Sequence, residues 1–298
     1  MKYQRYFFTI SIVLISMLVG LSTSAAQGSQ MAGLPYRVSG VHGWQQANPD
    51  GFGNPLITGV SALEEFDGQL YAGASNFAEG GQIWRSSTGM DWTAVSEPGF
   101  GSIFASTNLA IIDLIVFKGE IYAGTGWGNA QGQLWRSPNG TDWQMVTGDG
   151  FGNPDNTGIT TFMIYEDALY AAGGDDVDGL EVWRSDTGNL GSWTRVIAGG
   201  LGYPGNLNVT GFALFDGYLY LATEGPQPCQ VWRSADGDIW EPVTIDGFGD
   251  PNNISMGGWA ILGDYLYIGT RNEVNGAELW RYSISSGWEP VMQTGLAT

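Results

Sequence analysis

A phrase built on two tryptophans recurs five times and limits the folds open to this chain. One copy reads QLWRSPNGTDWQMV, from Gln133 to Val146. The first tryptophan of each copy falls at positions 84, 135, 183, 232 and 280, so the spacing is 48 to 51 residues. Self-similarity at a fixed period of this length indicates a repeat architecture.

Two further phrases recur in step with the first. The tyrosine of a Leu-Tyr or Ile-Tyr phrase falls at positions 71, 122, 170, 220 and 267, and a Gly-Phe-Gly or Gly-Leu-Gly phrase follows each tryptophan phrase but the last. No apolar pattern of helical period is present, and the 47 glycines separate short runs rich in Tyr, Trp, Val and Ile. This punctuation is typical of an all-β fold.

Each unit is expected to hold four strands. In the second unit they are predicted at 111–117, 120–125, 133–137 and 143–146. Lys-Gly or Asp-Gly forms the first tight turn, and a Ser-x-Asn-Gly or Ser-x-Asp-Gly sequence forms the turn between the third and fourth strands. Four-stranded antiparallel units repeating about every 50 residues are blades of a β-propeller. We therefore predict an all-β propeller with five complete repeats.

A half-repeat precedes the five complete units. Tyr36 and Arg37 align with the Trp-Arg of the phrase, and Trp44 aligns with its second tryptophan. Either five blades close and the half-repeat packs outside, or the chain forms an incomplete six-blade ring that lacks the first two strands of one blade. The sequence stops where another first strand would begin, so a truncated gene is a further alternative.

The repeated phrase resembles two families of propellers. The stretch SADGDIW, from Ser234 to Trp240, is similar to the Asp-box of sialidase-type propellers, although other units carry Thr or Asn in place of Asp236. The Leu-Tyr-x-x-Gly strand followed by an aromatic strand also resembles kelch repeats, with the glycine doublet kept at Gly173 and Gly174. Both resemblances imply a propeller. Neither implies an activity, because the matched residues are structural in those families.

The first residues differ from the rest of the chain. Lys2 and Arg5 precede an apolar run from Phe7 to Leu21, and small residues lead to a cleavage position after Ala26. This pattern predicts a signal peptide at 1–26, a linker at 27–35 and the propeller at 36–298. An uncleaved anchor is the alternative, but the run is short for a membrane span. We expect a secreted, extracellular or periplasmic protein without membrane insertion after cleavage.

Composition excludes several classes of function. After the predicted leader, thirty acidic residues face nine Lys and Arg, a net charge of −21. Such a surface repels nucleic acid and anionic membranes. His42 is the single histidine, which excludes multi-histidine metal sites and a histidine triad. Cys229 is the single cysteine and is expected to be a buried structural thiol. We expect a monomer.

The repeated tryptophans and arginines are assigned to packing. Eleven of the thirteen tryptophans occupy repeat positions, where large rings can bury area between blades. The arginine after the first tryptophan points to the opposite side of its strand and can meet carboxylates, carbonyls or aromatic rings. This structural interpretation covers Arg85, Arg136, Arg184, Arg233 and Arg281.

Variable loops at one end of the blades are the expected binding surface. Trp127 and Trp259 have no counterpart in the repeat, so packing within the repeat does not explain them. Together with amide and carboxylate groups, exposed aromatic faces suit sugar rings. The predicted ligand-binding residues are Trp127, Asn129, Trp259, Asn272, Glu273 and Asn275. The alternative for Trp127 is that it folds over its own glycine-rich loop.

The sequence GDDVDG places three acids close together. Asp175, Asp176 and Asp178 offer hard oxygen ligands of the kind that Ca²⁺ prefers. The spacing of an EF-hand is absent, and a solvated acidic loop is the alternative. No other cofactor is expected.

These observations favour an extracellular binding module, lectin-like, whose ligand is a glycan. One alternative is a secreted glycoside hydrolase or lyase, because Asp113 and Glu64 or Glu65 lie on or near inner strands. Asp113 and Glu65 could equally satisfy backbone groups or water in the channel. The other alternative is a structural or adhesion module that binds a cell-surface or protein partner.

Overall fold

A computed structural model of the protein describes residues 46–102, 108–127 and 131–292. The chain divides into a unit of residues 1–46 and a unit of residues 47–298, and the fold described below belongs to the second. The predicted signal peptide, the linker and the half-repeat strands before residue 46 lie outside the described residues, as do His42, Trp44 and Asn129. Among the described residues, no helix is both long and apolar enough to cross a membrane.

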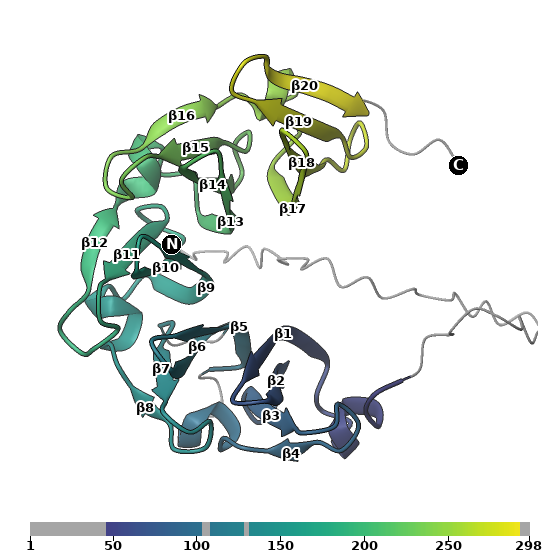
Figure 1. Cartoon of the computed structure of the whole chain (residues 1–298), viewed down its shortest axis with the longest axis vertical. Coiled ribbons are helices and arrows are strands. Elements are labelled where there is room, and N and C mark those ends of the chain that lie inside the picture. The colour runs from purple at the N-terminus through teal and green to yellow at the C-terminus, as the bar shows by residue number, and fades with distance from the viewer. Residues whose placement is uncertain (1–45, 103–107, 128–130, 293–298) are drawn as a thin grey trace, which may run out of the picture. The chain divides into compact units, whose positions relative to one another are not determined.

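The second unit is built from antiparallel four-stranded blades, so the predicted all-β propeller class is confirmed (Figure 1). In each blade, four consecutive strands pair in sequence order. The strands of the blades within the described residues are β1 (Gly59–Phe66), β2 (Gln69–Ser75), β3 (Gln82–Ser86) and β4 (Thr93–Ala94); β5 (Ala110–Phe117), β6 (Glu120–Gly126), β7 (Leu134–Ser137) and β8 (Gln144–Met145); β9 (Asn156–Tyr165), β10 (Ala168–Asp175), β11 (Glu181–Ser185) and β12 (Thr194–Ile197); β13 (Asn208–Phe215), β14 (Tyr218–Glu224), β15 (Val231–Ser234) and β16 (Glu241–Thr244); β17 (Ser255–Leu262), β18 (Tyr265–Arg271), β19 (Leu279–Ser283) and β20 (Gly287–Met292).

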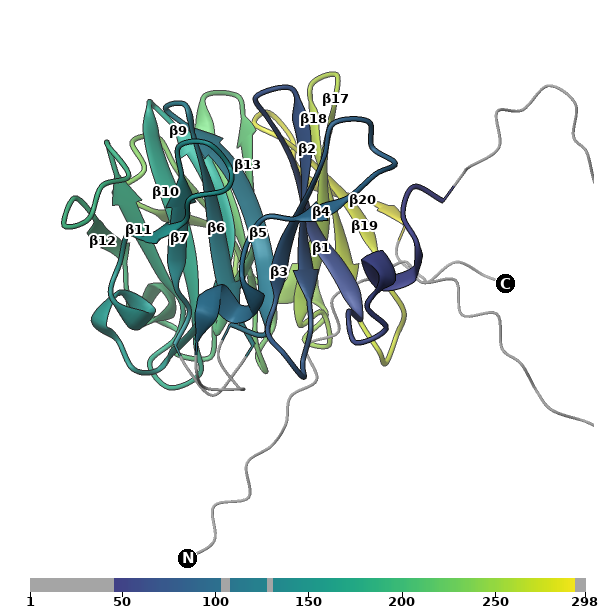
Figure 2. The ribbon, with the colours of Figure 1, turned by 90° about the horizontal axis from the view of Figure 1, so that it is seen from below.

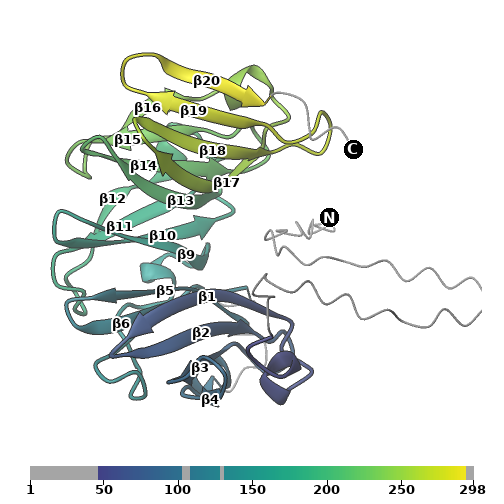
Figure 3. The same cartoon turned by 45° about the vertical axis from the view of Figure 1, so that its right-hand side comes forward.

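The first strand of each blade is innermost and packs against the first strand of the next blade. β1 packs on β5, β5 on β9, β9 on β13, and β13 on β17. Figure 3 shows these strands following one another through the unit, and Figure 2 shows the blades turned by 90° from the view of Figure 1. No comparable packing joins β17 to β1 within the described residues. The four junctions each enclose an apolar core.

The turn between the third and fourth strands is closed by its serine and its acid or amide. In the fourth blade, the Ser234 hydroxyl accepts the N–H of Gly237 at 2.8 Å, and the Asp236 carboxylate accepts two further backbone N–H groups at 2.8 and 2.9 Å. These bonds lower the pKa of Asp236. The Asp-box-like residues are therefore structural here, as the resemblance implied.

Glycine in this turn is required by the preceding blade. A Cβ placed on Gly140 of the second blade would collide with the Tyr71 hydroxyl of the first blade. Tyr71 is fully buried, and Gly140 has a φ of +74°, which also favours glycine. The same contact recurs between Tyr122 and Gly188 and between Tyr170 and Gly237.

Both tryptophans of the repeated phrase have a defined role at the blade junctions. The Phe100 ring, on the connection that enters the second blade, stacks on Trp135 with centroids 4.3 Å apart and planes 4° apart. Trp143 meets Phe100 edge-on, and its indole N–H donates to the Val95 carbonyl of the first blade at 3.0 Å. The stack recurs between Phe52 and Trp84, Phe151 and Trp183, and Phe248 and Trp280.

The repeated arginines mostly have the structural partners that the sequence predicts. Arg233 lies over the Tyr218 ring, 4.6 Å from its centroid, and Arg281 lies 4.2 Å from the centroid of Tyr265. Carboxylates lie within 2.6 to 3.1 Å of the guanidinium of Arg136, Arg184, Arg233 and Arg281. Where these ion pairs are exposed they contribute little stability, and the arginine stems can also contribute through packing.

The single cysteine is a structural thiol, as expected. Cys229 is fully buried in the core between the fourth and fifth blades. Burial raises the pKa of its thiol to about 12, which keeps it protonated and unreactive at neutral pH.

The tyrosine–glycine contact can be tested by a matched pair of substitutions. Gly140 and Gly89 occupy the same turn position with φ values of +74° and +77°, but a Cβ on Gly89 would have nothing within 4 Å. Both alanine variants should share the cost of the left-handed backbone, about 1–2 kcal/mol. Gly140→Ala should lose ~1–3 kcal/mol more through overpacking against Tyr71. Urea unfolding measures the difference, and equal losses in the two variants would contradict the contact.

Candidate functional site

The loops that can carry function gather at one end of the blades. In the second blade, the start of β5 pairs with the end of β6, because Ala110 lies opposite Gly126. The connection into β5 and the loop that follows β6 therefore share an end. The same register in the first blade, where Gly59 lies opposite Ser75, places its equivalent loops at that end too.

An aromatic pair bridges the first two blades at this loop end. Phe77 follows β2, Trp127 follows β6, and their rings stack with centroids 5.9 Å apart and planes 14° apart. Phe77 is 53 % exposed. Trp127 thus reaches the neighbouring blade instead of folding only over its own loop. A flat, partly exposed aromatic surface of this kind suits the apolar face of a ring-shaped ligand.

The backbone of Trp127 has an uncommon conformation. Its φ is +56°, in the left-handed region that bulky residues rarely adopt. Non-glycine residues persist there only when their surroundings hold them, and such strained residues cluster at functional sites. In this structure the stacking on Phe77 is the contact that accompanies the strain.

One partly buried acid lies on the inner strand of the second blade. The Asp113 carboxylate on β5 accepts the N–H of Phe162 on β9 at 2.8 Å and the N–H of Leu114 at 2.9 Å. It therefore satisfies a backbone group at the edge of the neighbouring blade, as the sequence allowed. Burial nevertheless raises the pKa of Asp113 from 3.8 to about 6, despite these hydrogen bonds.

A second acid lies on the inner strand of the first blade. Burial raises the pKa of Glu64 on β1, and the backbone of Val116 on β5 partly offsets that rise. Burial is the main cause of the raised pKa of Asp113, and the charge of Glu64 adds a smaller contribution. Carboxyl groups with perturbed pKa values are candidates for acid–base sites.

The acid pair and the aromatic pair belong to the same two blades. Asp113 is three residues from Ala110, so at roughly 3.3 Å per residue it lies ~10 Å along β5 from the loop end. A ligand lying on Phe77 and Trp127 could extend inward to the carboxyl groups over the length of about two sugar rings. We define these four residues, Glu64, Phe77, Asp113 and Trp127, as the candidate site.

The neighbouring acid Glu65 is outside this site. Its carboxylate accepts the N–H of Gly68 at 2.7 Å in the turn between β1 and β2, and its side chain is exposed. The sequence left Glu64 and Glu65 as alternatives. Side chains of successive strand residues point to opposite sides, and it is the charge of Glu64, not that of Glu65, that contributes to the raised pKa of Asp113.

Trp259 is placed differently from a loop residue. It lies within β17, joins the apolar core between the fourth and fifth blades, and its indole faces Gly211 on β13. A Cβ on Gly211 would lie 3.0 Å from the indole nitrogen. The small residue on β13 makes room for the ring, which gives Trp259 a packing role that the repeat pattern did not reveal.

The predicted polar residues of the fifth blade hold their own loop together. The Asn272 side chain is buried, accepts the N–H groups of Val274 and Asn275 and donates to Asp250 at 2.8 Å. Asn275 donates to the same Asp250 oxygen at 2.8 Å. Glu273 forms an ion pair with Arg271 at 2.6 Å. These three predicted residues are not part of the candidate site.

The predicted calcium loop has a structural arrangement of its own. Asp175 is fully buried; one of its oxygens accepts the N–H groups of Val177 and Asp178, and the other accepts from Asn153 at 2.7 Å. Burial raises the pKa of Asp176, and the charge of Asp175 adds to that rise. No group of three or more side chains suited to a metal ion is found in the residues that the structure describes.

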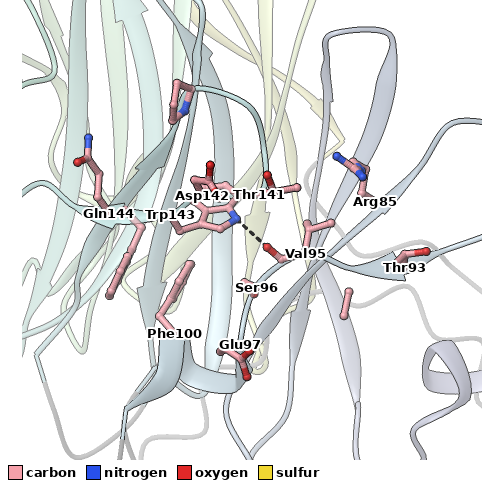
Figure 4. Close-up of a pocket in the computed structure, with 13 residues that line it drawn as sticks. Arg85, Thr93, Val95, Ser96, Glu97, Phe100, Thr141, Asp142, Trp143 and Gln144 are labelled. Atoms are coloured by element: carbon pink, nitrogen blue, oxygen red, sulfur yellow. Dashed lines mark hydrogen bonds between the residues drawn. The ribbon is translucent and has the colours of Figure 1, made fainter.

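An open cleft of about 860 Å³ lies between the outer strands of the first two blades (Figure 4). Arg85, Glu97 and Asp142 are among the residues that line it. Its aromatic residues stack on one another, and the indole N–H of Trp143 is used by the Val95 carbonyl. These rings serve the blade junction and recur at other junctions, so the cleft is a less specific feature than the candidate site.

Comparison with known proteins places the fold among solved enzymes. No protein family model and no curated protein matches the sequence. An ancestral GH74 enzyme has 18% identity and a TM-score of 0.54 over 80% of this chain and 33% of its own chain. A prolyl endopeptidase structure has 12% identity and a TM-score of 0.51 over 78% of this chain and 34% of its own chain. A sialidase of Trypanosoma rangeli has 10% identity and a TM-score of 0.48 over 79% of this chain and 48% of its own chain. This chain thus spans about one third of the length of the GH74 enzyme and of the prolyl endopeptidase.

These similarities correct the expectation of a lectin-like binding module. The two solved structures with TM-scores above 0.5, the ancestral GH74 enzyme and the prolyl endopeptidase, are both enzymes, and neither is a lectin. The propeller fold that both sequence resemblances implied is shown, whereas the kelch resemblance remains a sequence pattern alone. At these identities the similarity establishes the propeller fold, and function has to be argued from the site.

The pKa of Asp113 predicts a pH dependence of stability. Because the folded-state pKa is raised from 3.8 to about 6, the folded protein binds this proton more tightly than the unfolded chain does. The resulting stability is present below pH 4 and is lost as the pH rises toward 6. Relative to Asp113→Asn, the wild type should lose ~1–3 kcal/mol of unfolding free energy over this window, allowing for partial solvent screening. A constant difference from pH 4 to 6 would show that the pKa is not raised.

Proposed function

We propose that this chain is a carbohydrate-active propeller enzyme, a glycoside hydrolase whose acid–base pair is Asp113 and Glu64. The observation that carries the proposal is the pairing of two carboxyl groups with raised pKa values on adjacent inner strands. The aromatic pair of Phe77 and Trp127, on the same two blades, supports a sugar as the substrate. The signal peptide predicted at 1–26 would export the enzyme from the cytoplasm. Outside the cytoplasm the enzyme would meet polysaccharides.

The two carboxyl groups have different roles in this proposal. Asp113, with a pKa of about 6, can hold its proton in mildly acidic solution and donate it to the glycosidic oxygen as the bond to the anomeric carbon breaks. Glu64, in the ionised form whose charge raises the pKa of Asp113, either activates a water molecule or attacks the anomeric carbon directly. Water supplies the hydroxyl that the anomeric carbon finally carries, and the leaving sugar takes the proton.

The Asp113 environment suits this role. The N–H groups of Phe162 and Leu114 fix the orientation of the carboxyl, and no residue that the structure describes forms an ion pair with it; burial outweighs the lowering of the pKa by the two hydrogen bonds. Partial burial disfavours the charged form, which is the usual way in which proteins keep a carboxylic acid protonated near neutral pH.

Activity should depend on Asp113 and Glu64 but not on Glu65. Hydrolysis of a panel of polysaccharides and aryl glycosides would identify a substrate, and kcat/KM would then be measured for the variants. Asp113→Asn and Glu64→Gln should each lower kcat/KM by about 10²–10⁴-fold, the usual contribution of general acid–base catalysis. Glu65→Gln, which keeps an oxygen to accept the turn N–H, is the matched control and should stay within about twofold.

Failure of the panel with the wild type, or full activity in both Asp113→Asn and Glu64→Gln, would contradict the enzyme proposal. Thermal unfolding of each variant distinguishes lost chemistry from lost folding. Because Asp113→Asn also places an amide against two backbone N–H groups, Glu64→Gln is the cleaner of the two tests.

The aromatic pair should set substrate affinity. Truncation of an aromatic anchor typically costs about 2 kcal/mol of binding or more, so Trp127→Ala should raise KM by roughly tenfold or more with a smaller change in kcat. Val274→Ala is a suitable control, because Val274 is exposed in a loop of the fifth blade. An unchanged KM in Trp127→Ala would remove the aromatic pair from the substrate site.

A further inference from the structure

The first blade has an uncovered apolar face. Leu63 on β1 is 60% exposed, whereas the residues at the same position in the next three blades, Leu114, Phe162 and Phe212, are 4%, 6% and 8% exposed. In those blades this side chain packs on the preceding blade, as Leu114 does in the core that also contains Phe66. Leu63 therefore points toward the place of a blade before the first.

The fifth blade has the complementary uncovered face. Leu262, at the end of β17, is 71% exposed, whereas its counterparts Phe66, Phe117, Tyr165 and Phe215 are 8%, 2%, 9% and 9% exposed. Those counterparts pack on the following blade. The two uncovered faces are thus the two halves of the contact surface that each neighbouring pair of blades elsewhere shares.

The tyrosine–glycine contact is also unfilled on both faces. Among the described residues nothing lies within 4 Å of a Cβ on Gly89, where the tyrosine of a preceding blade would pack. Tyr267 of the fifth blade is partly exposed, although the four equivalent tyrosines are at most 1% exposed. A blade placed between the fifth and the first would bring a tyrosine to Gly89 and a turn glycine to Tyr267.

Ala47 of this chain already lies in the outer part of that blade position. The Trp92 indole N–H donates to the Ala47 carbonyl at 3.0 Å, just as the Trp143 indole donates to Val95 at the end of the previous blade. Ala47 therefore lies where the fourth strand of a preceding blade ends.

We infer that the faces of β1 and β17 bind a β-hairpin with the pattern of this chain's own first two blade strands, which completes a sixth blade. The hairpin supplies a first strand with large apolar residues at the positions of Leu114 and Phe117, and a second strand with tyrosine at the position of Tyr122. A complete blade of a second copy does not fit, because its own fourth strand would compete with Ala47. The occupant is therefore a two-stranded hairpin, which a synthetic peptide can supply in trans.

A synthetic hairpin of residues 208–224 tests this inference on the full chain, since it holds the required first strand and Tyr220. The peptide should bind one to one and raise the melting temperature of the protein with saturation. Its Tyr220→Ala form, and the protein variants Gly89→Ala and Leu262→Asp, should each weaken binding about tenfold or more. Gly191→Ala is the control for glycine, since its φ is +79° and a Cβ there would also have nothing within 4 Å.

Absence of binding to the wild type, or equal binding to Gly89→Ala and wild type, would overturn the inference. Sedimentation of the protein alone, and with the hairpin, measures the oligomeric state independently. If the protein alone self-associates and the hairpin does not dissociate the oligomer, the two faces serve a second copy and the inference is wrong. The test does not depend on hydrolytic activity, so it stands apart from the proposed function.

Discussion

The contact on which the rest of the structure depends is the aromatic clamp between one blade and the next. In four of the five blades the phenylalanine of a connection stacks on the first tryptophan, and the second tryptophan of the second blade also holds the previous blade through the Val95 carbonyl. At three junctions the buried tyrosine of one blade fits beneath the turn glycine of the next. A four-stranded sheet of this size is not stable alone, so these contacts are what make a row of short strands into a folded unit.

The clamp also explains how the candidate site is held. Asp113 belongs to one blade and takes its hydrogen bond from the next, while Glu64 acts on it from the blade before. Three blades therefore define the environment of one carboxyl group. Because β5 packs between β1 and β9, Asp113 is held on a rigid element, and Glu64 lies on β1, which packs on β5. Phe77 and Trp127 lie on loops, where sequences can vary without loss of the fold.

The fold could be predicted closely because its determinants repeat. The tryptophan, tyrosine and glycine phrases specify strand order and turn chemistry, and in the second blade the expected strands at 111–117 and 120–125 correspond to β5 and β6. The site could be predicted only in part, because strand side and contacts between blades are not written in any single repeat. Trp259 looked unmatched, yet it fills the space left by Gly211 on a neighbouring strand. Asn272 looked like a loop ligand, yet its amide oxygen accepts an N–H of its own turn and its amide nitrogen donates to Asp250.

The most direct measurement of the central claim is a crystal structure of Glu64→Gln with an oligosaccharide substrate. The account predicts one sugar ring stacked on Trp127 and Phe77, and a glycosidic oxygen within hydrogen-bonding distance of the Asp113 carboxyl. A sugar bound in the outer cleft between Arg85 and Asp142, with the inner strands free of ligand, would contradict it.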